Sequence, residues 1–78
     1  MSRSNVGAYT LRSVLNIFGD EPNIIVIVKS MAKETIYKKN DRMDNIPYEL
    51  EIPKQGSYLN MYYVTLAEET FLKCQIDV

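Results

Sequence analysis

The order of hydrophobic and polar residues first predicts a short amphipathic helix near the start of the chain. Four apolar side chains recur at the spacing that places them along one face of a helix: Leu11, Val14, Leu15 and Phe18. Thr10 is suited to cap the first turn, and Gly19 stands where helices often end with a left-handed residue. This helix supplies the first residues of the predicted core.

Three further segments have the composition of strands. Residues 24–28 are five consecutive apolar residues between turn-forming sequences, which is typical of a central strand covered on both faces. Residues 34–39 predict the returning strand of a hairpin, and residues 58–65 are rich in aromatic and β-branched side chains. The residues just before this last strand, 53–57, have the composition of a turn.

Two segments allow more than one interpretation. Residues 48–52 alternate apolar and acidic side chains, which predicts a half-buried strand, but Pro47 could equally open a single helical turn. The last segment, 65–78, alternates as a strand to the chain end, and it also has apolar residues at helical spacing after a capping-box sequence. We favour a hairpin that turns at Glu68 and Glu69, with a C-terminal helix as the alternative.

Together these elements predict one small α+β domain over residues 1–78, with residues 1–8 flexible. One short N-terminal helix packs on one face of a mainly antiparallel sheet of four or five strands, joined largely by hairpins. The opposite face of the sheet would then be open to solvent or to a partner.

Composition restricts the chemistry that this domain can perform. Hydrophobic residues make up 46% of the chain, charged residues 24%, and the net charge is −1, as in ordinary soluble globular proteins. The chain has no histidine and a single cysteine, Cys74, which excludes Ser-His-Asp and Cys-His catalysis, histidine-ligated metals and disulfide frameworks. We therefore expect no enzyme activity, no metal and no cofactor.

The single thiol and the short apolar runs also bear on location. A lone cysteine without a disulfide framework fits a reducing cell interior. The longest apolar run, residues 24–28, is far shorter than a membrane-spanning helix, and the first residues do not resemble a signal peptide. We expect a cytoplasmic protein with no membrane partner, in which Cys74 is packed in the last strand rather than reactive.

Six tyrosines and no tryptophan make tyrosine the first candidate for a binding surface. Successive side chains of a strand point to opposite faces of the sheet. If Leu59, Met61 and Tyr63 face the helix, the residues between them face away from it. Tyr58 and Tyr62 then lie on the open face. Tyrosine suits interfaces because it joins a large contact area to a polar tip, although it is also a common strand residue.

Charge is divided unevenly along the chain. Residues 29–42 carry five basic and two acidic residues, whereas residues 43–78 carry two basic and six acidic ones. The basic segment could contact a nucleic-acid backbone, or it could form a charged edge that discourages pairing with another sheet. The basic candidates are Lys33, Lys38, Lys39 and Arg42.

The acidic part of the chain has two interpretations as well. Glu49 and Glu51 share a face if their segment is a strand, and Glu68 and Glu69 are adjacent at the predicted turn. These carboxylates could replace phosphates in a mimic of nucleic acid. They could equally form an ordinary solvated edge of the sheet.

The order of several short motifs carries a resemblance. Phe18-Gly19-Asp20 follows the leucine-bearing helix, a β-branched strand comes next, and Ile46-Pro47-Tyr48-Glu49-Leu50 precedes an alternating strand at the chain end. This order resembles short uncharacterised accessory proteins encoded by bacteriophages and prophages. The resemblance implies a small accessory protein that binds a host protein, as inhibitors of host defence systems do.

The leading functional hypothesis is therefore a non-catalytic binding protein whose partner is a host protein. One alternative is a nucleic-acid-associated protein or an acidic mimic of nucleic acid. Another is a structural homo-oligomer that self-associates through an exposed edge strand or through its tyrosine-bearing face.

Overall fold

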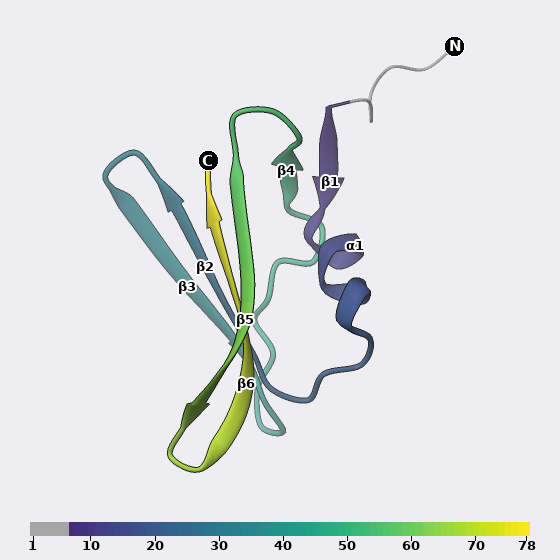
Figure 1. Ribbon diagram of the computed structural model, residues 1–78, viewed down its shortest axis with the longest axis vertical. Helices are drawn as coiled ribbons and strands as arrows, with labels where there is room; N and C mark the ends of the chain where they lie inside the picture. The colour runs from purple at the N-terminus through teal and green to yellow at the C-terminus, as the bar shows by residue number, and fades with distance from the viewer. Residues whose placement is uncertain (1–6) are drawn as a thin grey trace.

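A four-stranded sheet forms one layer of the protein, and a short helix with a two-stranded sheet forms the other (Figure 1). This computed structural model describes residues 7–78. The large sheet has the strand order β3-β2-β6-β5 and consists of β2 (Ile24–Ser30), β3 (Lys33–Lys39), β5 (Tyr58–Leu66) and β6 (Glu69–Asp77). The second layer consists of β1 (Ala8–Thr10), α1 (Leu11–Leu15), the 3₁₀ helix η1 (Asn16–Phe18) and β4 (Glu51–Pro53).

The predicted N-terminal helix is confirmed, with a tighter last turn than expected. The side chain of Thr10 accepts a hydrogen bond of 3.2 Å from the backbone N–H of Ser13, as an N-cap does. Three residues of the predicted apolar face are buried: Leu11, Val14 and Leu15. The α-helix is followed directly by the tighter 3₁₀ helix η1, which ends before Gly19. Gly19 has a φ of 78°, a backbone conformation that glycine adopts more easily than other residues.

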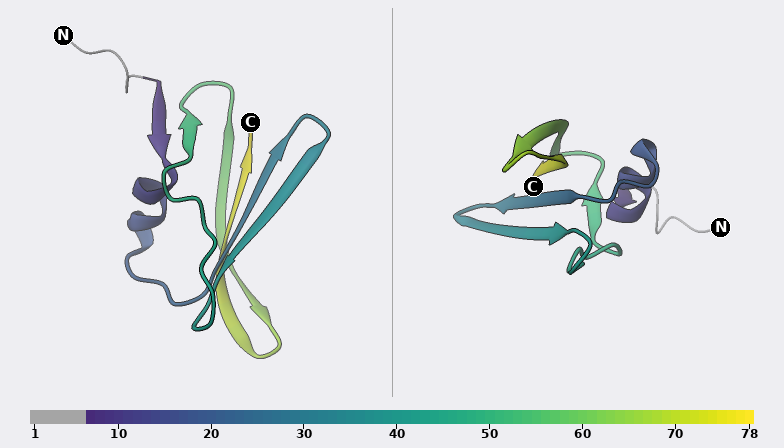
Figure 2. Two further views of the ribbon diagram at one scale, coloured as in Figure 1. Left: turned by 180° about the vertical axis from the view of Figure 1, so that it is seen from behind. Right: turned by 90° about the horizontal axis from the view of Figure 1, so that it is seen from below.

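Strand β2 is the central strand, as predicted, but it is not covered on both faces. It pairs with β3 on one side and with β6 on the other. Ile24 and Val26 are buried beneath the second layer, whereas Ile25 and Ile27 are only half-buried. This part of the prediction is wrong because no element within residues 7–78 packs on the opposite side of the sheet, as Figure 2 shows from below.

The chain ends in a β-hairpin, so the predicted terminal strand is confirmed and the helical alternative is wrong. The turn lies at Ala67 and Glu68, one residue earlier than predicted. Strands β5 and β6 pair from Leu66 with Glu69 to Tyr58 with Asp77. The alternating residues of β6 enter the core, which stabilises the strand over a helix.

The large sheet is mixed, which corrects the prediction of a mainly antiparallel sheet with up to five strands. Strands β2 and β6 run parallel, from Ile24 beside Leu72 to Lys29 beside Asp77. After β3 the chain passes through the second layer and returns as the β5–β6 hairpin on the other side of β2. Each hairpin is a local structure, but the way two hairpins join is decided by packing between distant segments.

The segment before β4 is a turn and not the predicted strand. The backbone N–H of Leu50 donates to the carbonyl of Pro47 at 3.0 Å, so the chain reverses at Tyr48 and Glu49. The alternative that the sequence left open was a single helical turn opened by Pro47, and the structure has instead a hydrogen-bonded turn whose first residue is Pro47. Strand β4 starts only at Glu51 and pairs with β1.

The core lies between the two layers. Its fully buried members come from α1, β2, β4 and β6: Leu11, Val26, Ile52, Leu72, Cys74 and Ile76. Met61 packs against this cluster, and the ring of Tyr63 meets that of Phe18 edge to face at 6.0 Å. The predicted helix-facing side of β5 is therefore confirmed. Most of the segment expected to be flexible, 1–8, lies outside the described residues, and Ala8 pairs with Pro53.

Candidate binding surface

The side of the large sheet that faces away from α1, here called the outer face, is uncovered within residues 7–78. The strand registers and the alternation of side chains decide which residues lie there. The outer face consists of Ile25, Ile27, Lys29, Glu34, Ile36, Lys38, Tyr58, Asn60, Tyr62, Val64, Leu66, Glu69, Phe71, Lys73, Gln75 and Asp77.

Apolar side chains form the middle of the outer face. Ile27 and Ile36 are direct partners across β2 and β3, and Ile25 lies next to them on the same face. The side chain of Ile36 is 59% exposed. At the β5 side, Tyr58 and Tyr62 are also exposed, as the sequence predicts for this face. A sheet face of this kind is typical of a surface that another molecule covers.

The outer face is hollowed beside the β5–β6 turn. The hollow has a volume of about 270 Å³. Its lining comes from all four strands of the large sheet and from the β5–β6 turn: Ile25, Ile36, Lys38, Leu66, Ala67, Glu69 and Phe71. Phe71 is 5% exposed, although it lies on the side of the sheet without a covering layer. The hollow is thus an apolar cavity with a cation and an anion at its rim.

Two lysines of the outer face lie over aromatic rings. Lys38 Nζ is 5.5 Å from the ring centre of Phe71, and Lys73 Nζ is 5.6 Å from that of Tyr62. Cation–π contacts of this kind hold an ammonium group close to apolar surface. Within residues 7–78 the only ion pair joins Arg12 to Glu49, so neither lysine is neutralised by a carboxylate there.

The structure brings together only some of the predicted site residues. Tyr58, Tyr62 and Lys38 share the outer face. Lys39 points to the other side of β3 and donates from Nζ to the carbonyl of Glu21 at 2.9 Å. Arg42 lies in the loop after β3, where its backbone N–H donates to the side chain of Asn40. The basic candidates therefore do not form one surface.

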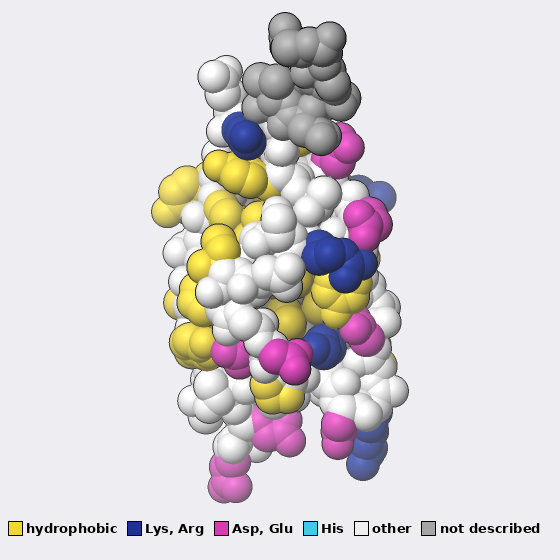
Figure 3. All heavy atoms as spheres, turned by 90° about the vertical axis from the view of Figure 1, so that its right-hand side faces the viewer, with side chains coloured by type: hydrophobic (Ala, Val, Ile, Leu, Met, Phe, Trp, Pro, Cys, Tyr) yellow, Lys and Arg dark blue, Asp and Glu magenta, His cyan; other side chains and the backbone are white. Residues whose placement is uncertain are grey.

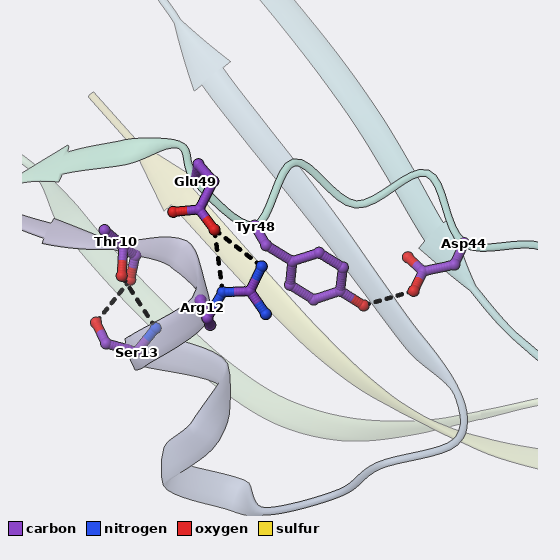
Figure 4. Close-up of polar contacts among 6 residues, drawn as sticks. All are labelled: Thr10, Arg12, Ser13, Asp44, Tyr48 and Glu49. Atoms are coloured by element: carbon purple, nitrogen blue, oxygen red, sulfur yellow. Dashed lines mark hydrogen bonds and ion pairs between the residues drawn. The ribbon is translucent and has the colours of Figure 1, made fainter.

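Two of the acidic candidates, Glu49 and Glu51, lie on the side of the second layer, whereas Glu68 is in the β5–β6 turn and Glu69 begins β6. Glu49 sits in the turn that begins at Pro47 and accepts hydrogen bonds from the guanidinium of Arg12 at 2.8 and 3.1 Å (Figure 4). Glu51 belongs to β4 and is exposed. Glu49 and Glu51 do not share the face of one strand, because the turn at Pro47 reaches to Leu50.

Arg12 is also part of a second contact. Its guanidinium lies 4.9 Å from the ring centre of Tyr48, whose hydroxyl donates to Asp44 at 2.6 Å (Figure 4). Burial, followed by the hydrogen bond and the charge of Asp44, raises the pKa of Tyr48 to about 12. These contacts join the turn at Tyr48 and Glu49 to Arg12 of α1. We therefore assign Arg12, Tyr48 and Glu49 a role in holding the turn against the helix.

The exposed side of the second layer differs from the outer face of the sheet. Figure 3 looks onto this layer. Charged side chains of both signs lie over its right half and its lower end, and hydrophobic side chains gather along its left margin. This hydrophobic margin is a further apolar region besides the outer face.

Sequence reasoning missed several residues of the outer face, among them Ile25, Ile27, Ile36, Phe71 and Lys73. The isoleucine run was interpreted as covered on both faces, so its outward half was not considered as a surface. One signal was present in the sequence. The favoured interpretation of the sequence has one short N-terminal helix, and a single short helix can cover only one side of a sheet.

Comparison with known proteins gives no family for this chain. No family model, no curated protein and no solved structure matches it. The resemblance to phage-encoded accessory proteins stays a prediction. Within residues 7–78, no group of three or more His, Cys, Asp or Glu side chains could hold a metal, and no helix is long and apolar enough to cross a membrane.

Proposed function

We propose that this protein is a non-catalytic binding protein that docks the outer face of its sheet on another protein. The observation that supports this proposal is the apolar hollow floored by Phe71, in a face that no element of residues 7–78 covers. Removing apolar surface from water favours the formation of a complex. A partner that covers Ile25, Ile27 and Ile36 would gain this stabilisation.

The lysines indicate the chemistry of the partner. Lys38 stands at the rim of the hollow, and Lys73 lies next to Tyr62. A protein that places an apolar side chain in the hollow and carboxylates beside it would match both features. In the setting that the phage resemblance implies, this partner is a host protein. Nucleic acid is disfavoured because Lys38, Lys39 and Arg42 do not share a face.

Substitution at the outer face tests the proposal. The immobilised protein would be incubated with a lysate of the cells in which it is naturally made, and the captured protein would be purified. Ile36→Asp places a negative charge in the middle of the face at an exposed position. We expect the Kd for the purified partner to rise by about tenfold or more, because an apolar contact is lost and a carboxylate meets carboxylates.

The matched control adds the same charge outside the outer face. Met31→Asp lies in the β2–β3 turn, where the side chain is 99% exposed, and it should leave the Kd unchanged. Tyr58→Ala with Tyr62→Ala should weaken the complex in the same direction as Ile36→Asp. Equal Kd values for Ile36→Asp and Met31→Asp would refute the proposal. Salt-sensitive retention of nucleic acid, with no protein bound at the outer face, would refute it as well.

A further inference from the structure

The two edges of the large sheet have opposite chemistry. Strand β3 forms one edge and carries four charged side chains among its seven residues: Lys33, Glu34, Lys38 and Lys39. Strand β5 forms the other edge, and its nine residues include no charged residue, no proline and no glycine. Charged residues and prolines on an edge strand prevent it from pairing with another chain. The edge at β3 has this protection, and the edge at β5 does not.

The hairpin geometry shows which backbone groups of β5 are free. The turn has two residues, Ala67 and Glu68, so Leu66 and Glu69 exchange both of their hydrogen bonds. Bonded and non-bonded pairs then alternate along the hairpin. Four residues of β5 consequently direct N–H and C=O away from β6: Leu59, Met61, Tyr63 and Thr65.

These backbone groups have no partner in the rest of the described chain. Within residues 7–78, β6 is the only segment whose backbone bonds to β5. The edge therefore presents four N–H and four C=O groups in a row. An added strand would satisfy all of them, as in the recognition of extended segments by sheet edges.

Apolar side chains line the same edge. Tyr63 is 50% exposed although it faces the second layer. Beside Leu59, a groove of about 370 Å³ separates β5 from the second layer. Its other lining residues are Tyr9, Ser13, Val14 and Ile17. A strand added to β5 would run along the margin of this groove. It would cover apolar side chains on the helix-facing side of the sheet and on its outer face.

We propose that β5 pairs antiparallel with β5 of a second copy of this chain, with Tyr62 on the two-fold axis. In this register Leu59 faces Thr65 of the other copy, and Met61 faces Tyr63. All eight free backbone groups of each copy are then bonded. Centring the axis one residue earlier leaves Thr65 without a partner, and centring it one residue later leaves Leu59 without one.

A second copy suits this edge better than an extended segment of another protein. The strand is uncharged along its whole length, so no like charges meet when it pairs with itself. The result is a continuous eight-stranded sheet, twice the four strands of one copy. This inference does not rest on the proposed function, because the outer face of each copy stays uncovered in the pair.

A cysteine on the axis tests the register. In Tyr62→Cys the two thiols belong to a non-bonded antiparallel pair, whose Cα atoms are about 4.5 Å apart and within reach of a disulfide. Mild oxidation at high micromolar concentration should give a covalent dimer. Cys74 is buried, so the unmodified chain should stay uncrosslinked.

The matched control for this test is Tyr58→Cys, on the same face of β5. In the proposed register residue 58 of one copy lies opposite Leu66 of the other. Residue 58 of the other copy is eight residues further along that strand, so the two introduced thiols are about 26 Å apart. Tyr58→Cys should therefore not crosslink. Equal crosslinking of both variants, or none with Tyr62→Cys, would overturn the proposed register.

Proline at the edge tests the backbone pairing independently. Thr65→Pro removes one outward N–H two residues before the Ala67 turn and leaves the bonds to β6 intact. We expect the dimer dissociation constant, measured by sedimentation, to rise by about tenfold or more. Glu34→Pro, at the equivalent place on the β3 edge, should leave it unchanged. A monomeric unmodified chain at high micromolar concentration would overturn the inference. Unchanged dimerisation in a folded Thr65→Pro variant would show that an interface other than β5 joins the copies.

Discussion

Burial alone controls the chemistry of Cys74. The side chain lies on the helix-facing side of β6, and no part of it is exposed. Burial raises the pKa of its thiol from 9.0 to about 11. The thiolate is the reactive form of cysteine, so near neutral pH the thiol is both protonated and shielded. The expectation that Cys74 is packed in the last strand is confirmed.

The reactivity of Cys74 should therefore report the opening of the fold. We expect an aromatic disulfide reagent to modify the native protein slowly at neutral pH and the urea-unfolded protein at once. Cys74→Ala, which should give no signal, is the control. The neutral thiol stabilises the fold fully below pH 9, and this contribution is lost as the pH rises through about 11. Rapid modification of the native protein would contradict this account.

Residue-level expectations succeeded where they depended on local periodicity. Thr10 caps the helix, and Tyr58 and Tyr62 lie on the outer face, because a spacing of a few residues decides both. The environment of Glu49 could not be predicted in this way. Its partner Arg12 is 37 positions away in the chain, and a turn at Pro47 brings the two together.

At the scale of elements, the β2–β3 and β5–β6 turns both place residues other than glycine at positive φ, a conformation that such residues rarely adopt. Met31 has a φ of 55°, Ala67 of 50° and Glu68 of 67°. Residues other than glycine, asparagine and aspartate enter this left-handed region at a cost of roughly 1–2 kcal/mol each. The β5–β6 turn needs a positive φ at both central positions, for which Asn-Gly is the preferred pair. The absence of that pair explains why the turn was predicted one residue late.

Replacing this turn should stabilise the protein. We expect Ala67→Asn with Glu68→Gly to raise the free energy of unfolding by about 1 kcal/mol or more, because both residues accept the existing backbone conformation. Urea denaturation at fixed protein concentration measures the change. Glu69→Gly is the control: it lies in the strand, where glycine should lower the free energy of unfolding. A double substitution that destabilises as much as Glu69→Gly would contradict the turn geometry.

The sequence allowed most elements to be predicted, but not their order in the sheet. Alternation and β-branched runs are local signals, and they located β2, β3, β5 and β6. The parallel pairing of Ile24 with Leu72 joins residues 48 positions apart, and no local pattern encodes it. Strand β1 was missed because its three residues are too few to show a period.

At the scale of the whole molecule, the single covering layer accounts for the open outer face, and the strand order leaves β5 as a free edge. The second layer buries one side of the large sheet, which leaves the outer face open. Pairing through β5 would join two such sheets edge to edge. The two outer faces would then form one surface with a hollow at each Phe71. A dimer of this form could bind two partner molecules, or one partner with a repeated motif.

The two layers should unfold together, because they share one core. Leu11 begins α1, is completely buried and packs in the cluster that also contains Leu72 and Ile76. Leu11→Ala should lower the free energy of unfolding by about 2–5 kcal/mol, as for other buried leucines. Ile17→Ala is the control, because Ile17 is 73% exposed and its truncation should change the free energy by roughly 0.5 kcal/mol or less.

Amide hydrogen exchange distinguishes shared unfolding from separate unfolding of the layers. In Leu11→Ala, we expect the amides of β2 and β6 to lose protection together with those of α1, although residue 11 lies outside the large sheet. The sheet depends on the second layer because Val26 and Cys74 would be exposed to water without it. Full protection of β2 alongside an unprotected α1 would mean that the four-stranded sheet is stable by itself.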